Sequence, residues 1–315
     1  MNNVDTRIAR LWFGLRNNLS WRPAPNVRLS SRTVFRFVQI ATIAVFVGRA
    51  WQHLYWDAPY RALLWDENWL RPLVEGVLGG DWGVYVRTSE QGIERWIRGT
   101  GILYLLCALA AAVGAQRWRK PVVALLAIGA ANLLLLAALY YKEHFWQAGQ
   151  LIEYTLQWGS PVFLILLLQT KPPVEQLIRW MRIATALTFV GHGLYAFGYY
   201  PRPVLFVEMT MSILQVSDVG AAGFLQIVGI LDFVAALLLF VPGKLGRVAL
   251  LYCVIWGFLT SVARLWAHFH PAFLDNLLLQ WLHEAVMRSP HFLIPAAIWY
   301  AQRAATVSPE ELDAG

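Results

Sequence analysis

Long apolar stretches follow one another along most of the chain, separated by short polar or charged connections. The clearest are PVVALLAIGAANLLLLAALYY at 121–141 and GFLQIVGILDFVAALLLFVP at 223–242. Each has about the 20 residues that an α-helix needs to cross a hydrocarbon core of ~30 Å. The pattern predicts eight membrane-spanning helices, near 34–56, 99–116, 121–141, 150–170, 177–199, 222–242, 246–267 and 280–302.

The positive charges of the connections alternate between the two sides of the predicted membrane. Lysine or arginine follows every second span, as at Arg119, Lys171, Lys244 and Arg303. Cytoplasmic loops are enriched in these residues. The pattern therefore predicts a bacterial inner-membrane protein with both termini in the cytoplasm.

Three sequence matches recur in the same order in the two halves of the span region. IATIAVFVG at 40–48 matches IATALTFVG at 183–191, VALL occurs at 123 and again at 248, and SPVFLI at 160–165 matches SPHFLI at 289–294. Ordered matches indicate a duplicated unit. A unit of four spans enters the membrane twice from the same side, so we expect parallel repeats at 34–170 and 171–303.

Three segments lie outside this repeat. Residues 1–33 combine a basic amphipathic stretch with a proline-containing linker, which predicts a helix on the inner membrane surface. The insertion 57–98 is rich in tryptophan and acidic residues, which predicts an outer-face helix pair broken at Gly79 and Gly80. Residues 304–315 form a short polar tail.

The composition agrees with a membrane protein and excludes several other classes. The 315 residues are 58% hydrophobic and only 14% charged, whereas soluble domains have about a quarter charged residues. The net charge of +7 is concentrated before the first span, where it favours lipid headgroups over nucleic acid as the partner. Cys107 and Cys253 fall in apolar spans without metal-site spacing, and no P-loop, dinucleotide fingerprint or GxSxG motif is present.

Ionisable and amide side chains interrupt the spans at similar depths. In the first span, Arg49, Gln52, His53 and Trp56 occupy i, i+3, i+4 and i+7, so they share one helix face. The fourth span of each copy has a similar polar stripe ahead of a Ser-Pro pair, and the third spans end in polar residues. The candidates for ligand binding or proton relay are Arg49, Gln52, His53, Glu153, His192, Arg264, His268, His283 and Glu284.

Two interpretations of these residues remain open. An ionisable group in hydrocarbon costs about 2.5–3.5 kcal/mol on insertion scales, so a group of them is expected to face a wet cavity or one another. The alternative is a set of structural ion pairs, such as Arg49 with Glu153 and Arg264 with Glu284. Asp232, in the sixth span, is either a proton or ion site or a buried hydrogen-bonded carboxyl.

The stretch RIATALTFVGHGLYAF at 182–197 resembles the start of the DoxX-like family of small bacterial membrane proteins. The resemblance rests on Arg182, Gly191, His192, Gly193 and Phe197, with a fainter copy at Arg36, Gly48 and Arg49. It implies a four-helix fold used in membrane redox assemblies, including quinone-linked sulfur oxidation. The fusion of two copies departs from the family pattern. A weaker likeness is to the HTTM proteins related to vitamin K-dependent carboxylase.

Three functions are therefore expected as alternatives. In the first, a quinone or another lipid-soluble ligand binds in an outer-leaflet cavity between the repeats, where Arg49, His53 and His192 contact its oxygens. Glu153, His283 and Glu284 would then relay protons. The second is a scaffold subunit that docks a periplasmic protein through 57–98, and the third is a small-molecule or lipid transporter. Whether the protein is an enzyme is not decided, and no catalytic residue is assigned.

Overall fold

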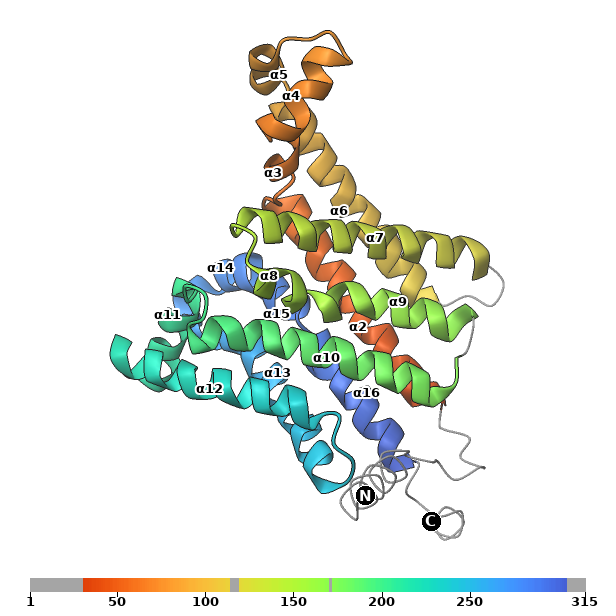
Figure 1. Ribbon diagram of the computed structural model, residues 1–315, viewed down its shortest axis with the longest axis vertical. Helices are drawn as coiled ribbons and strands as arrows, with labels where there is room; N and C mark the ends of the chain where they lie inside the picture. Colours follow the sequence, from red (N-terminus) through yellow and green to blue (C-terminus); the bar gives the residue numbers. More distant parts are fainter. Residues whose placement is uncertain (1–30, 114–118, 170–171, 305–315) are drawn as a thin grey trace, which may run out of the picture.

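The computed structural model describes residues 31–113, 119–169 and 172–304, in which every regular element is helical (Figure 1). The segment 1–30, with most of the expected surface helix and linker, and the tail from 305 lie outside these ranges. The helices are α2 (Ser31–Tyr55), α3 (Arg61–Leu64), α4 (Glu67–Gly76), α5 (Trp82–Thr88), α6 (Glu90–Val113), α7 (Arg119–Glu143), α8 (Ala148–Glu153), α9 (Thr155–Gln169), α10 (Val174–Phe197), α11 (Val204–Leu214), α12 (Asp218–Leu238), α13 (Lys244–Ala267), η1 (Pro271–Phe273), α14 (Leu274–Asn276), the π-helix η2 (Leu277–Trp281), α15 (Leu282–Val286) and α16 (Pro290–Ala304).

Within the described ranges, six helical segments are long and apolar enough to cross a membrane, which supports a multi-pass α-helical membrane protein. Helix α10 has the length of a span, but its N-terminal part carries the charged residues Glu175, Arg179 and Arg182, and it is not among the six. Helix α16 has only 15 residues. The six segments are Arg32–Tyr55, Glu90–Val113, Arg119–Glu143, Ala148–Gln169, Asp218–Leu238 and Lys244–Ala267.

The outer insertion is shorter than the sequence pattern indicates. Helix α6 begins at Glu90, so residues 90–98 belong to the second span helix rather than to the insertion. Ile93 and Ile97 in this extension are buried in a small core with Tyr60 and Leu136. Packing on one face therefore extends the helix beyond the continuous apolar run that hydropathy detects.

Helices α3, α4 and α5 form a projection at the top of Figure 1, away from the main bundle. Its chain turns between α4 and α5 at Gly79, whose φ of +67° lies in the left-handed region that glycine adopts without strain. The projection is tied to the bundle by polar contacts. Lys142 of α7 pairs with Asp66, and Arg61 pairs with Glu90 at 2.6 Å.

The bundle contains two groups of helices with similar packing partners. Helix α2 contacts α6 and α9, while α10 contacts α12 and α16; α7 packs on α6 and α9, and α13 packs on α12 and α16. The two groups also contact each other: α2 packs against α16, and α10 packs against α8 and α9. One hydrophobic core runs through both groups, with Phe46, Leu164, Met181 and Ile298 among its buried residues.

Two glycines allow the close approach between the groups. A Cβ at Gly48 would lie 2.7 Å from Met287 Cβ and 2.9 Å from the His283 carbonyl oxygen. A Cβ at Gly191, the matching position in the sequence repeat, would lie 2.7 Å from the Glu153 backbone nitrogen and 2.8 Å from the Gly149 carbonyl oxygen. These contacts explain physically why the glycine of FVG occurs in both halves.

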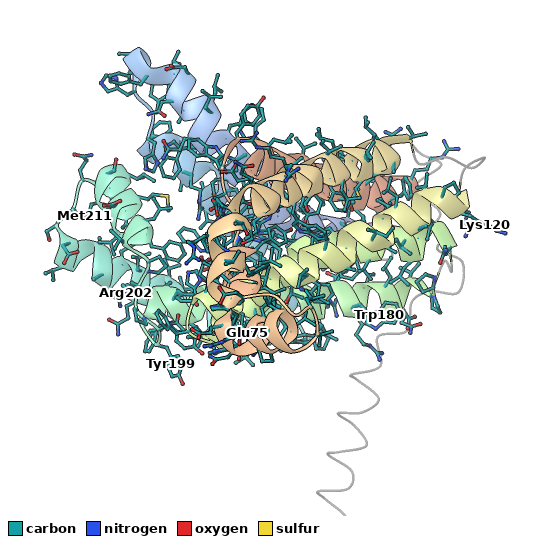
Figure 2. All side chains as sticks on the ribbon, turned by 90° about the horizontal axis from the view of Figure 1, so that it is seen from above. Glu75, Lys120, Trp180, Tyr199, Arg202 and Met211 are labelled. Atoms are coloured by element: carbon teal, nitrogen blue, oxygen red, sulfur yellow. The ribbon has the colours of Figure 1, made fainter. Side chains whose placement is uncertain are left out.

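The two ends of the bundle can be located in Figure 2, which labels residues at both. Lys120 and Trp180 lie at one end, called here the Lys120 end. Tyr199, Arg202 and Met211 lie at the opposite end, called here the Tyr199 end. Helix α10 runs from the first end to the second and stops at Gly198, whose φ is +93°.

Candidate functional site

Arg49 lies at the centre of a buried network in the first half of the bundle. Its side chain is 1% exposed and donates from Nε and Nη2 to Gln157 Oε1 at 3.1 and 2.6 Å. Its Nη1 donates to Gln52 Oε1 at 2.6 Å, and Gln52 in turn donates to the Tyr140 hydroxyl at 2.7 Å. The ion pair between Arg49 and Glu153 that the sequence suggested is not formed, because amides on α2 and α9 occupy the guanidinium instead.

His53 extends the same network through neutral groups. Its Nδ1 lies 2.7 Å from the Arg49 carbonyl oxygen, and its Nε2 lies 3.3 Å from the Tyr60 hydroxyl. That hydroxyl and the hydroxyl of Tyr104 both donate to Asn132 Oδ1, at 3.0 and 2.6 Å. Both ring nitrogens of His53 therefore have partners, which is typical of a structural histidine.

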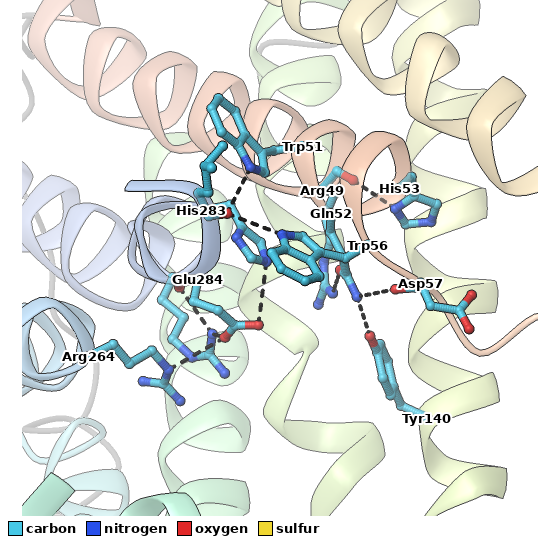
Figure 3. Close-up of polar contacts among 12 residues, drawn as sticks. Arg49, Trp51, Gln52, His53, Trp56, Asp57, Tyr140, Arg264, His283 and Glu284 are labelled. Carbon is cyan, nitrogen blue, oxygen red and sulfur yellow. Dashed lines mark hydrogen bonds and ion pairs between the residues drawn. The ribbon is translucent and has the colours of Figure 1, made fainter. Parts of the chain in front are cut away.

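A second polar group surrounds Glu284 of α15 (Figure 3). Glu284 accepts from Arg288 and lies 3.4 Å from Arg264 Nε, so two guanidinium groups share one carboxylate. His283 Nε2 is 3.8 Å from the other carboxylate oxygen. The suggested Arg264–Glu284 pair is therefore present, together with an arginine that the sequence analysis did not select.

The π-helical turn η2 connects this group to α2. The indole nitrogens of Trp51 and Trp56 both donate to the carbonyl oxygen of Leu279, each at 3.1 Å (Figure 3). A π-helical turn disturbs the regular backbone ladder and is frequent at functional sites. Here it supplies an acceptor that fixes α2 against the segment bearing His283 and Glu284.

His192, Glu153 and His291 form a third group. His192 Nδ1 is 3.6 Å from Glu153 Oε1, and the rings of His192 and His291 meet edge to face with centroids 5.2 Å apart. His291 is 1% exposed, and neither of its ring nitrogens has a hydrogen-bond partner among the described residues. The Nε2 of His192 is likewise buried without such a partner in this part of the chain.

A cavity of about 560 Å3 borders this third group. Most of its lining is apolar and comes from α10, α11, α12 and α13, for example Phe189, Phe206, Phe224 and Trp256. Polar side chains at its wall include His192, His291, Arg264 and Arg288. These residues belong to the second half of the chain, so the cavity lies within that half, whereas the sequence analysis expected a cavity between the halves.

Asp232 also lines the cavity, at a distance from the arginines. Its carboxyl is buried and accepts a hydrogen bond of 2.7 Å from the Tyr252 hydroxyl. Tyr252 precedes Arg264 by twelve residues on α13, which is about 18 Å along the axis at ~1.5 Å per residue. Asp232 is therefore separated from the basic end of the cavity.

The sequence candidates thus separate into three places. His192 and Arg264 line the cavity, and Glu153, His283 and Glu284 lie in contact with lining residues or with their partners. Arg49, Gln52 and His53 form their own network. His268 packs its ring on Trp281 at a centroid distance of 3.6 Å and bonds to the Arg264 carbonyl oxygen.

Arg288 and His291 are the cavity residues that the sequence analysis missed. A signal for them exists in the repeat: WGSPVFLI at 158–165 aligns with MRSPHFLI at 287–294. In this alignment Arg288 replaces Gly159 and His291 replaces Val162. The second stretch therefore has a charge and an imidazole at two positions that are small or apolar in the first.

The described residues contain no group of three or more His, Cys, Asp or Glu side chains placed to hold a metal ion. No protein-family model matches the chain, and no curated protein or solved structure shows significant similarity to it.

Proposed function

We propose that this chain is a bacterial inner-membrane protein that binds a lipid-soluble ligand in the cavity of its second half. The observation that supports this most directly is His291. A buried polar group without a hydrogen bond costs about 1–3 kcal/mol, so the imidazole is expected to have a partner other than the described residues. Its position at the wall of a largely apolar cavity makes a ligand oxygen that partner.

In the redox-associated form of the proposal, the ligand is a quinone. His291, His192 and the two arginines supply donors for ring oxygens, while the apolar wall receives the ring and tail. The contact between His192 and Glu153 provides an imidazole–carboxylate pair that can accept and pass on a proton. The resemblance to DoxX-like proteins favours this form, with the chain as a subunit of a membrane complex.

The proposal includes eight spans arranged as two parallel repeats. Helix α10 and the segment from α14 to α16 would complete the six apolar helices to eight. The matching contacts of α2 and α10, and the matched glycines Gly48 and Gly191, support a pseudo-twofold relation. With both termini cytoplasmic, the Tyr199 end and the α3–α5 projection would face the periplasm.

A scaffold function is the second candidate, and the α3–α5 projection favours it. Trp69, Leu73, Val77 and Leu78 on and after α4 are all exposed. Such a surface would suit a periplasmic protein partner. A transporter is favoured less, because the cavity described here belongs to one half and not to the interface on which alternating access depends.

The proposal is tested by mass spectrometry of the lipophilic extract from purified protein. We expect a near-stoichiometric ligand in wild type and a loss of about tenfold in His291→Phe, which removes the donor but keeps an aromatic ring. Tyr195→Phe is the matched control, because it removes a buried hydroxyl that does not line the cavity and that meets no hydrogen-bond criterion among the described residues. Only bulk phospholipid in all three proteins would contradict the proposal.

A further inference from the structure

The basic end of the cavity contains more positive than negative charge. Arg264 and Arg288 both line the cavity, and both are paired with the single carboxylate of Glu284. Their side chains are only 5% and 12% exposed, so solvent contributes little to their neutralisation. This three-residue group carries a net charge of +1.

The other ionisable groups nearby do not provide a clear counter-charge. Glu153 is in contact with His192 and, as a carboxylate, contributes one negative charge, which the positive charge of Arg49 offsets. The side-chain hydrogen bonds of Arg49 go to the amides of Gln157 and Gln52. Asp232 on α12 accepts a hydrogen bond from Tyr252, which precedes Arg264 by about 18 Å along the axis of α13.

The hydrogen-bonding groups lead to the same conclusion as the charges. The Nε atoms of Arg264 and Arg288 are buried without a hydrogen-bond partner among the described residues, although Arg264 Nε faces Glu284 at ion-pair distance. A guanidinium nitrogen can only donate. His291 and His192 add ring nitrogens without partners at the same wall. The site thus has an excess of donors as well as of positive charge.

An unbalanced buried charge is costly in a region of low dielectric, and an ion of opposite sign removes that cost. We propose that the occupant of the cavity is an amphiphile with an anionic head, either a carboxylate or a phosphate, bound by Arg264, Arg288 and His291. This inference rests on the proposed ligand-binding function and narrows its ligand class. It replaces the neutral quinone ring with a negatively charged head.

The cavity also determines the direction in which such a ligand lies. The head is placed at the arginines, and the apolar body extends along Phe206, Phe224 and Trp256. The volume of about 560 Å3 lies within the range of ~300–1,000 Å3 for small-ligand sites, which suits a single chain or a ring-bearing acid.

Three probes of equal chain length test the charge of the head. Dodecanoate, dodecyl phosphate and dodecanol are titrated into wild-type protein in nanodiscs of zwitterionic lipid, at a pH where the carboxylate is ionised. Binding is followed by tryptophan fluorescence, since Trp256 and Trp266 line the cavity. We expect saturable binding of at least one anion, about tenfold or more tighter than dodecanol.

Variants connect this binding to the arginines. Arg288→Gln and Arg264→Gln are each expected to weaken the binding of the anionic probe by about tenfold. The binding of dodecanol should stay unchanged. Two variants are used so that a folding defect in one does not decide the test. Thr210→Val is the matched control, because it changes an uncharged lining residue whose hydroxyl bonds within its own helix.

The outcomes separate this inference from the proposed function. Preference for dodecanoate or for dodecyl phosphate identifies a carboxylate or a phosphate as the head. The proposal of an anionic head is overturned if dodecanol binds as tightly as the anions, or if the stoichiometric molecule in the extract is a neutral quinone. Either result leaves the proposal of a lipid-soluble ligand in place. Failure of all three probes, together with an extract that holds only bulk phospholipid, would contradict the ligand-binding function itself.

Discussion

Two histidines with the same burial differ in the surroundings of their ring nitrogens. His53 and His291 are each 1% exposed. The ring of His53 contacts the Arg49 carbonyl and the Tyr60 hydroxyl, whereas the ring of His291 has no hydrogen-bond partner in the described part of the chain. The first is explained by packing and hydrogen bonding within the protein. For the second, we propose that a ligand supplies the partner.

The same substitution at both positions distinguishes these roles. In ligand-free protein, His53→Phe removes two contacts and should lower the free energy of unfolding by about 1–3 kcal/mol. His291→Phe removes no side-chain hydrogen bond to the described residues and should leave stability unchanged or raise it by about 1 kcal/mol. Thermal unfolding in detergent measures both. Equal destabilisation would show that His291 has a structural role.

At the residue scale, the sequence pattern located polar side chains better than it assigned their partners. The i, i+3, i+4 spacing correctly brought Arg49, Gln52 and His53 onto one face of α2, where Arg49 contacts both of the others. Spacing on one helix cannot show which helix packs opposite. Gln157 rather than Glu153 therefore emerged as the partner of Arg49 only in the structure.

At the scale of elements, the two matched glycines set the distance between the halves. Gly48→Ala and Gly191→Ala each place a methyl group under 3.0 Å from backbone atoms of the opposing helix. Overpacking of this kind costs about 1–3 kcal/mol, so both variants should unfold at lower temperature. Gly223→Ala is the control, since its Cβ meets nothing within 4 Å and a helical alanine is favoured. Equal unfolding temperatures would contradict the close packing.

The α3–α5 projection should loosen in acid. Asp66 caps α4 by accepting from the Trp69 amide at 2.9 Å, and its hydrogen bond with Lys142 holds the pKa of the carboxyl below its ordinary value. A lowered pKa stabilises the folded state above the ordinary value of about 4, and this stabilisation is lost as the pH falls through the lower folded-state value. Hydrogen exchange of 61–88 should therefore increase below about pH 4.

Asp66→Asn tests the origin of that change. The variant should exchange faster in 61–88 at neutral pH, and it should lose most of the acid-dependent increase because the titrating carboxyl is gone. Glu75→Gln, whose only ion pair in the described ranges is with exposed Arg71, is the matched control and should keep the wild-type profile. A wild-type profile in Asp66→Asn would exclude this contact as the tether.

Element boundaries were predictable where hydropathy alone determines them. The apolar runs in α7 and α12 gave helices near the expected places, since their length and composition leave few alternatives. The start of α6 at Glu90 was not predictable in this way. Residues 90–98 mix charged and apolar side chains, and the burial of Ile93 and Ile97 in a small core with Tyr60 and Leu136 favours their helical conformation.

At the scale of the whole molecule, the proposed orientation can be tested by labelling single cysteines in intact cells. Glu75→Cys on the projection should react with an impermeant maleimide from outside, and Lys120→Cys at the opposite end only after permeabilisation (Figure 2). Both positions are exposed, whereas native Cys107 and Cys253 are buried and should give little background. The reverse labelling pattern would invert the topology.

At the level of the whole molecule, the two halves of the bundle have similar packing partners but differ at the cavity. Both halves share packing contacts and a close-approach glycine, but Arg288 and His291 occur where the first half has Gly159 and Val162. The proposed duplication would account for these shared contacts, and the two replacements place an arginine and a histidine at the wall of the described cavity. The first half instead supplies the insertion and the network in which Arg49 donates to the amides of Gln52 and Gln157.

We propose that the cavity beside His291 holds a ligand. A density map of the purified protein would show that ligand directly. We expect non-protein density bounded by Phe206 and Trp256, with its polar end within hydrogen-bond distance of His291 and Arg288. The map of His291→Phe should lack this density. A wild-type cavity closed by side chains, with the His291 ring bonded to protein atoms, would contradict the account.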